Sequence, residues 1–365
     1  MFLTYLDIKQ LRNLTSVAFQ PNPTCNIFYG NNGSGKTSLL EAIYCLSLAR
    51  SFRTRLHSRV IQHGKEHFTV FGKLQNKERS ISLGIQRTMT GKPIIHIETK
   101  PTTSVSALTQ MLPIQLINHQ SHNMLITPKF RRQFMNWGVF HVEHQFLTIW
   151  QNYQQALKQR NALIRHDAHL VDHSQISTWN KRLCEEADKL HCMRLKYIEQ
   201  FKTVFFDIWK QLMGGAISLT YSRGWPSDKT LIETLENSYN ADRKVGYTQS
   251  GPQRADIHLR LDGTPVQDVL SQGQQKLLIY CLKLAQGVLL RQQAQKNCLY
   301  LIDDLPAELD AQKRSLIAQQ LFQLGAQIFI TGVSPEDLTS FSQHPDSQMF
   351  HVKHGEIKTP AVGRP

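Results

Sequence analysis

The first stretch that could do chemistry is a glycine-rich turn ending in lysine and threonine. Residues 30–37 have the sequence Gly-Asn-Asn-Gly-Ser-Gly-Lys-Thr, which matches the pattern G-x-x-x-x-G-K-[ST] at all four fixed positions. An apolar run at residues 25–29 precedes the turn, and residues 37–49 place apolar side chains at helical spacing. An ordinary strand-to-helix turn has the same outline, but the full match favours a loop that binds nucleotide phosphates.

The roles expected in this loop follow from its chemistry. Backbone N–H groups of the glycine-rich turn would surround a phosphate, helped by the positive end of the helix dipole. Lys36 would supply a catalytic cation for the β- and γ-phosphates of ATP, and Thr37 would hold Mg²⁺. The residues expected to contact the nucleotide are Gly30, Asn31, Asn32, Gly33, Ser34, Gly35, Lys36 and Thr37.

A second candidate element is an apolar run at residues 298–302 that ends in two aspartates. Phosphate-loop ATPases place the carboxylate that orders Mg²⁺ at such a strand end, and Asp303 fits that role. Asp304 would position the attacking water. By itself the pattern is weak, since many strands end in acidic turns. The pair lies near the opposite end of the chain from Lys36, so the nucleotide-binding fold must be split.

The elements expected before and between these two motifs indicate how the nucleotide-binding fold is divided along the chain. Residues 2–11 and 15–19 form a hairpin-like pair, and residues 68–74, 80–86 and 93–99 alternate as an antiparallel meander does. Two amphipathic helices follow, around residues 146–157 and 190–208, expected to fold back as an antiparallel pair. We therefore expect an N-terminal half of the nucleotide domain at residues 1–120, an inserted helical lobe at 121–215 and a C-terminal half at 216–365.

Charge and composition narrow the function class. The 365 residues include 42 Lys and Arg against 28 Asp and Glu, a formal charge of +14. This excess suits a polyanionic partner such as nucleic acid, and solubility alone would explain it equally well. Six cysteines without a C-x-x-C pair, an N-terminus without a signal sequence and no apolar run near about 18 residues predict a cytoplasmic protein that does not enter a membrane. The candidate DNA contacts are Arg50, Arg53, Arg55, Arg59, Arg131 and Arg132.

A third motif, Ser271-Gln272-Gly273-Gln274, opens an apolar helix. Ser-x-x-Gln at this position is a capping box. The motif also follows a strand and precedes the acidic strand, which is the order found in ABC-type ATPases. The two interpretations are compatible, because a helix N-terminus is an anion site in either case.

Taken together, the motifs resemble those of the ABC/SMC ATPase head family. Residues 30–37, 270–275, 301–304 and 308–310 resemble its Walker A, signature, Walker B and D-loop motifs. Residues 31–44, 49–53, 131–132, 251–256 and 300–304 are more closely similar to the RecF family of bacterial repair ATPases. The resemblance implies an α/β fold: a split ABC/SMC-type P-loop ATPase head with an antiparallel N-terminal sheet and a small inserted helical lobe.

The same resemblance implies a mechanism. Ser271, Gly273, Gln274 and Asp310 would contact ATP bound to a second subunit, and Gln120 would occupy the glutamine-loop position beside ATP and Mg²⁺. ATP would close a homodimer on single-stranded or gapped duplex DNA, and slow, DNA-stimulated hydrolysis would reopen it. Assistance in recombinase loading with RecO- and RecR-like mediators, and in SOS induction, is likewise implied.

Three positions depart from the usual family pattern. Asp304 stands where transporters have glutamate, and this shorter carboxylate agrees with slow turnover. Ala307 replaces the serine that usually precedes Glu308-Leu309-Asp310, and Thr331-Gly332 stands where a switch histidine is expected.

Three other classes share part of this pattern. A transporter ATPase subunit usually has Leu-Ser-Gly-Gly-Gln rather than the Leu-Ser-Gln-Gly-Gln found here. A clamp of the zinc-hook or SMC type would need a C-x-x-C hook or longer helices. A nuclease fused to an ATPase head would need a further acidic metal cluster.

Overall fold

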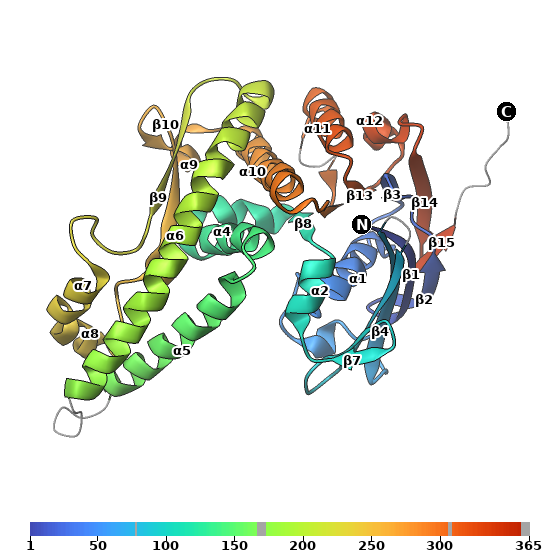
Figure 1. Cartoon of the computed structure of the whole chain (residues 1–365). Coiled ribbons are helices and arrows are strands. Elements are labelled where there is room, and N and C mark those ends of the chain that lie inside the picture. The colour runs from blue at the N-terminus through green and yellow to red at the C-terminus, as the bar shows by residue number, and fades with distance from the viewer. Residues whose placement is uncertain (77–78, 166–172, 306–308, 359–365) are drawn as a thin grey trace. The chain divides into compact units, whose positions relative to one another are not determined.

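The computed structural model describes all residues except 77–78, 166–172, 306–308 and 359–365 (Figure 1). The chain forms two compact units. The head unit consists of Met1–Ser121 together with Gln272–Pro365, and the middle unit is His122–Ser271. The two segments of the head unit are therefore separated in the sequence by the whole of the middle unit.

One layer of the head unit is an antiparallel six-stranded sheet of order β2-β1-β4-β5-β6-β7. In β5 the side chains of Ile81, Leu83 and Ile85 are buried while their neighbours are more exposed, which is the period-two pattern of a sheet with one face in the core. The predicted hairpin and meander are confirmed. The strands are β1 (Phe2–Leu11), β2 (Leu14–Phe19), β4 (His67–Asn76), β5 (Arg79–Thr88), β6 (Ile94–Ile97) and β7 (Lys100–Thr102).

The second sheet of the head unit has the order β15-β14-β3-β13-β12-β8, and all its strands pair in parallel except β14 with β15. Every residue of β12 and β13 is buried, as expected for parallel strands covered on both faces. The strands are β3 (Cys25–Tyr29), β8 (Ile114–Ile117), β12 (Leu299–Ile302), β13 (Gln327–Gly332), β14 (Ser347–Lys353) and β15 (Glu356–Lys358).

Helix α1 (Lys36–Leu48) joins the two sheets of the head unit in one core (Figure 1). Its buried Leu39, Leu40 and Ile43 belong to the same cluster as Leu6 of β1 and Phe329 of β13. The other helices of the head unit are α2 (Val105–Met111), α10 (Gln272–Ala294), α11 (Ala311–Leu324) and α12 (Thr339–Ser342), with short turns at η1 (His57–Arg59), η2 (His119–His122) and η6 (Glu336–Leu338). The helix after the phosphate loop is thus fixed from both sides.

The middle unit is built on two long helices, α5 (Phe146–Arg165) and α6 (His173–Leu212), which pack together as predicted (Figure 1). Its other helices are α3 (Asn123–Ile126), α4 (Pro128–Val142), α7 (Leu231–Asn237), α8 (Tyr239–Val245) and α9 (Val266–Val269), with η4 at Pro252–Arg254.

The expected end of the insertion at residue 215 differs from the structure. After Gly215 the chain forms a three-stranded antiparallel sheet of β9 (Ile217–Ser222), β10 (Asp256–Leu261) and β11 (Thr264–Pro265). β9 packs on α6 and β10 on α4, so residues 216–271 cluster with the helices and not with the head. Alternating residues at 217–221 and 254–261 predict strands from the sequence, but such a pattern carries no information about the packing partner of a strand.

A buried ion pair holds α5 to the α8 segment of the middle unit. The guanidinium of Arg160 lies 2.8 Å from the carboxylate of Asp242, and both side chains are fully buried. Asn180 and Thr248 accept further hydrogen bonds from Arg160, at 2.7 and 2.6 Å. Because both charges are buried, removing one of them leaves the other without a counter-charge in the interior of the protein.

We therefore expect Asp242→Asn to destabilise the protein by about 3–5 kcal/mol, the range for breaking a buried pair. Glu199→Gln is the matched control, because the Glu199–Lys202 pair is at the surface and such pairs contribute about 0–1 kcal/mol. Urea unfolding curves measure both effects. Equal shifts in the two variants would contradict a structural role for the Arg160 pair.

Candidate nucleotide-binding site

The phosphate loop of the head unit connects β3 to α1, as the sequence predicts. Gly30 has φ +143°, and a Cβ atom on it would lie 2.3 Å from the carbonyl oxygen of Val352. Its N–H donates to the carbonyl of Val333 at 3.1 Å. Only glycine fits at this close approach of three backbone segments.

The loop is supported by a turn that sequence analysis did not connect with it. Asn13, between β1 and β2, donates from Nδ2 to the carbonyl of Gly33 at 3.3 Å and accepts from the hydroxyl of Ser38 at 3.0 Å. The N–H of Gly355 donates to the carbonyl of Ser34 at 2.8 Å. The hairpin expected from residues 2–11 and 15–19 places Asn13 in the connecting turn, but the contact of Asn13 with the loop depends on tertiary packing.

The phosphate loop and the acidic strand end meet in one place. The hydroxyl of Thr37 donates to Oδ1 of Asp303 at 3.0 Å, across 266 positions of sequence. β3, β13 and β12 are parallel neighbours, so their carboxyl ends lie at one edge of the sheet. A hydroxyl and a carboxylate oxygen are ligands that Mg²⁺ accepts, with the remaining positions left to phosphate and water. The buried hydroxyl of Ser34 has no hydrogen-bond partner in the described residues, and it could donate a hydrogen bond to a phosphate oxygen.

Lys36 is held inside the loop. Its ammonium group donates to the carbonyls of Gly30 at 2.6 Å and Asn31 at 3.0 Å. Partial burial lowers the pKa of Lys36, while the negative charges of Asp304 and Asp303 act in the opposite direction. Both carboxylates are therefore close enough to influence this cation.

Asp304 has an unusual backbone for a non-glycine residue, with φ +58°. Its N–H donates to the hydroxyl of Thr331 at 2.8 Å. Desolvation raises the pKa of Asp304, and the charge of Asp303 raises it further, while Lys36 opposes the shift. A carboxylate with a raised pKa beside a metal-type carboxylate is suited to accept a proton.

Gln120 lies shortly after β8, which pairs in parallel with β12 so that Ile117 is opposite Ile302. The N–H of Asp303 donates to the carbonyl of Ile117 at 2.9 Å. Asn118, whose side chain accepts the N–H of Gln120 at 3.1 Å, has a buried amide nitrogen without a partner. Asn118 is a further polar group at this edge to which the sequence analysis gave no role.

The residues of the signature and D-loop motifs are placed at the starts of two helices. α10 begins directly after Ser271, and Ser271 and Gln274 are exposed while Gly273 is half-buried. Asp310 caps α11 by accepting the N–H of Lys313 at 2.9 Å, and it too is exposed. Ala307 and Glu308 lie outside the described residues, so the expected effect of Ala307 stays a prediction.

The candidate DNA contacts divide into two groups. Arg50, Arg53, Arg55 and Arg59 of the head unit are exposed, on the segment around η1. That segment is anchored by the fully buried carboxylate of Glu41, which accepts two hydrogen bonds from Arg12 and lies 3.8 Å from Arg53.

The two arginines of the middle unit are engaged internally. Nε and Nη2 of Arg131 donate to both carboxylate oxygens of Asp256 at 2.8 and 2.7 Å, and Nη1 donates to the carbonyl of Leu125 at 3.0 Å. Arg132 donates to the carbonyl of Ala255 at 3.2 Å and is half-buried. The interpretation of Arg131 as a DNA contact is therefore not supported, because an internal carboxylate uses its guanidinium.

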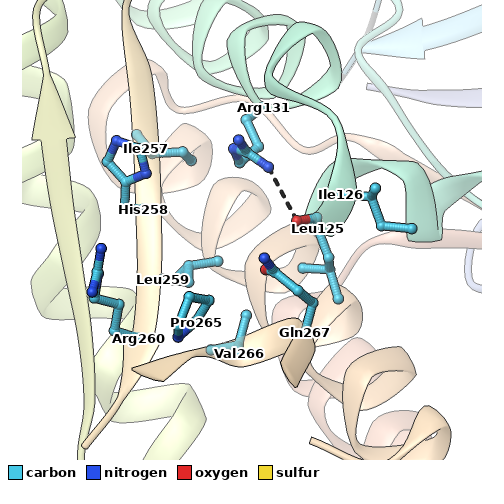
Figure 2. A pocket seen from close by; sticks show the side chains of 10 residues that line it. All are labelled: Leu125, Ile126, Arg131, Ile257, His258, Leu259, Arg260, Pro265, Val266 and Gln267. Carbon is cyan, nitrogen blue, oxygen red and sulfur yellow. Dashed lines mark hydrogen bonds between the residues drawn. The ribbon is translucent and has the colours of Figure 1, made fainter. Parts of the chain in front are cut away.

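A pocket of about 110 Å³ in the middle unit lies beside Arg131 (Figure 2). Its apolar lining is formed by Leu125, Ile126, Ile257, Leu259, Pro265 and Val266. The dashed line in Figure 2 marks the hydrogen bond from Arg131 to the carbonyl of Leu125. None of the expected ATP- or Mg²⁺-contacting residues lines this pocket. The nucleotide site is thus defined by the sheet edge of the head unit and not by this cavity.

The fold and the site together define the class of ABC/SMC-type P-loop ATPase heads. A model of the family described as "RecF/RecN/SMC N terminal domain" matches residues 2–358. A protein of Stutzerimonas stutzeri named "DNA replication and repair protein RecF" is 43% identical over 98% of this chain and 97% of its own length. A protein of Shewanella woodyi with the same name is 42% identical over 97% of each chain. The chain therefore belongs to the RecF/RecN/SMC family, and within it to the RecF proteins.

Solved structures agree on the fold. A structure of "the recombination mediator protein RecF-ATP in RecFOR pathway" matches with a TM-score of 0.88 at 22% identity, over 99% of this chain and 98% of that one. An SMC head bound to a winged-helix domain of ScpA matches with a TM-score of 0.59 at 14% identity, over 98% and 96%. The expected ABC/SMC head fold is confirmed.

Across the described part of the chain, no helix has both the length and the apolar character needed to cross a bilayer. Nor do these residues bring three or more His, Cys, Asp or Glu side chains together as a metal site.

We expect Asp304→Asn to lower ATP turnover by about a hundredfold or more, the range for losing a general base. A turnover rate equal to that of the parent protein would exclude Asp304 as the base.

The Asp304→Asn change should also stabilise the protein at pH 7. A raised pKa means that the folded state binds protons more tightly, so ionisation of Asp304 costs stability as pH rises above the usual value of 3.8. Unfolding at pH 7 and pH 3.5 measures this, because the advantage of the Asn variant should disappear at the lower pH.

Proposed function

We propose that the protein is an ATP- and DNA-binding protein of DNA replication and recombinational gap repair. The observation that carries this proposal is the contact between Thr37 and Asp303, which unites the phosphate loop with the acidic strand end. The names of the relatives support the biological setting, since they are DNA replication and repair proteins. The ATP-bound RecF structure supports ATP as the nucleotide.

In the proposed site, Thr37 and Asp303 would hold Mg²⁺ with Gln120 nearby, and a metal bound there would supply positive charge beside the phosphates. The loop N–H groups of residues 30–37 and the ammonium of Lys36 bind the β- and γ-phosphates. Lys36 would exchange its two carbonyl partners for phosphate oxygens. Asp304 accepts the proton of the attacking water, and its short side chain agrees with a slow ATPase. Stimulation of this ATPase by DNA is proposed from the family resemblance alone.

Homodimerisation is proposed from the exposed motif residues. Ser271, Gln274 and Asp310 are exposed at the starts of α10 and α11. In the proposed dimer, the helix that begins after Ser271 directs its N–H groups at the γ-phosphate held by a second subunit. ATP would thus shift a monomer–dimer equilibrium, and hydrolysis would reverse it.

DNA binding is proposed for the exposed basic segment of the head unit. Arg50, Arg53, Arg55 and Arg59 add four positive charges, and one buried carboxylate, Glu41, lies beneath them. This arrangement suits the phosphate backbone of single-stranded or gapped duplex DNA in the cytoplasm. RecO- and RecR-like mediators, recombinase loading and SOS induction are proposed as the context, supported by the RecFOR setting of the solved relative.

The dimer is tested by light scattering with and without ATP-Mg²⁺. We expect the mass to double with ATP in the parent protein. It should stay monomeric in Ser271→Arg, because a bulky cation would block the helix start. Equilibrium dialysis with labelled ATP should show unchanged nucleotide binding by this variant. If the mass of the parent protein did not change on addition of ATP-Mg²⁺, the proposed ATP-dependent dimer would be contradicted.

Replacing Arg53 and Arg55 together by alanine should weaken binding to a gapped duplex. A plot of the logarithm of the DNA association constant against the logarithm of salt concentration should become shallower by about two, one for each lost phosphate contact. Arg79→Ala with Lys100→Ala is the control, since both residues are exposed on the sheet of the same unit. Fluorescence anisotropy at several salt concentrations measures the slopes. Equal slopes in the two double variants would remove the η1 segment from the DNA interface.

A further inference from the structure

The end of β13 contains a buried threonine that contacts both aspartates of the acidic pair. Thr331 is 1% exposed, and its hydroxyl donates to Oδ1 of Asp303 at 2.8 Å. The same hydroxyl accepts the backbone N–H of Asp304 at 2.8 Å. In the sequence, Thr331 is notable only because it stands where the family pattern has a switch histidine.

These two bonds fix different parts of the neighbouring aspartates. The bond to Asp303 orients the carboxylate whose same oxygen also accepts from Thr37 at 3.0 Å. The bond from Asp304 holds the peptide between the two aspartates while Asp304 keeps its left-handed φ of +58°. A hydroxyl that accepts one hydrogen bond and donates another is polarised by the first, so the two bonds strengthen each other.

The same strand end also holds the phosphate loop. The carbonyl of Val333, two residues after Thr331, accepts the N–H of Gly30 at 3.1 Å. β13 lies between β3 and β12 in the sheet, with Ile330 paired to Ile27 on one side and to Ile302 on the other. Residues 331–333 therefore connect the phosphate loop to the acidic pair through hydrogen bonds on both sides.

We propose that Thr331 is a positioning residue that sets the geometry of Asp303 for Mg²⁺ and of Asp304 for the attacking water. Its hydroxyl is hydrogen-bonded to the two aspartates, and it acts through them. In a site that holds Mg²⁺ with few protein ligands, a fixed carboxylate orientation controls how much the metal strengthens nucleotide binding. This inference rests on the proposed function, because it assigns a role in the same ATP site.

The test compares Thr331→Val, which keeps the side-chain shape and removes the hydroxyl, with Thr331→Ser, which keeps the hydroxyl. A fluorescent ATP analogue is titrated in EDTA and in Mg²⁺, and the ratio of the two dissociation constants is taken. We expect the valine variant to reduce this Mg²⁺ enhancement about tenfold and turnover about tenfold to a hundredfold, the range for losing a partner of a metal ligand. The serine variant should restore both values, and affinity in EDTA should be unchanged in all variants.

Thr109→Val is the matched control, because its hydroxyl also donates within the head unit, to the carbonyls of Ser47 and Val105 at 3.2 and 3.1 Å. It should behave as the parent. A Thr331→Val variant with the Mg²⁺ enhancement and turnover of the parent would overturn the inference. Loss of affinity in EDTA for both Thr331→Val and Thr331→Ala would also overturn it, since a merely structural role would then explain the effect. A parent that binds no nucleotide would instead refute the proposed function itself.

Discussion

The parallel pairing of β3, β13 and β12 is the constraint on which the rest of the head unit depends. Parallel neighbours end at the same sheet edge, so a loop after β3 and a carboxylate after β12 meet although the chain between them is long. The contact from Thr37 to Asp303 is the chemical result. Without β13 as the central strand, neither the loop nor the acidic pair would have its present support.

The antiparallel sheet is tied to this arrangement by a buried amide. The side chain of Gln327, at the start of β13, accepts the N–H of Leu3 at 2.7 Å and donates to the carbonyls of Leu3 and Asn22 at 2.8 Å. α1 fills the space between the sheets with one shared hydrophobic core. The start and the end of β13 therefore have different tasks, since one end joins the sheets and the other holds the site.

The insertion is accommodated because it has a core of its own. In the middle unit, Arg160 of α5 donates to Asn180 of α6 and pairs with the buried carboxylate of Asp242 in α8. Phe134 of α4 packs edge-on against Phe201 of α6. Its strands β9 and β10 pair with each other and add to this unit. A self-contained insertion lets the two halves of the head sheet pair as if they were continuous.

The sequence by itself determined the local parts of this protein. The fixed positions of residues 30–37, the apolar run of β12, the alternating N-terminal strands and the helical periodicity of α5 and α6 are short-range patterns, and each predicted its element. The tertiary structure alone decided which of these parts meet. The support from Asn13 and Thr331, the internal use of Arg131 and the assignment of residues 216–271 to the middle unit depend on strand pairing and on partners far away in the chain. Residue type specifies what a side chain can bond, but long-range packing selects the partner.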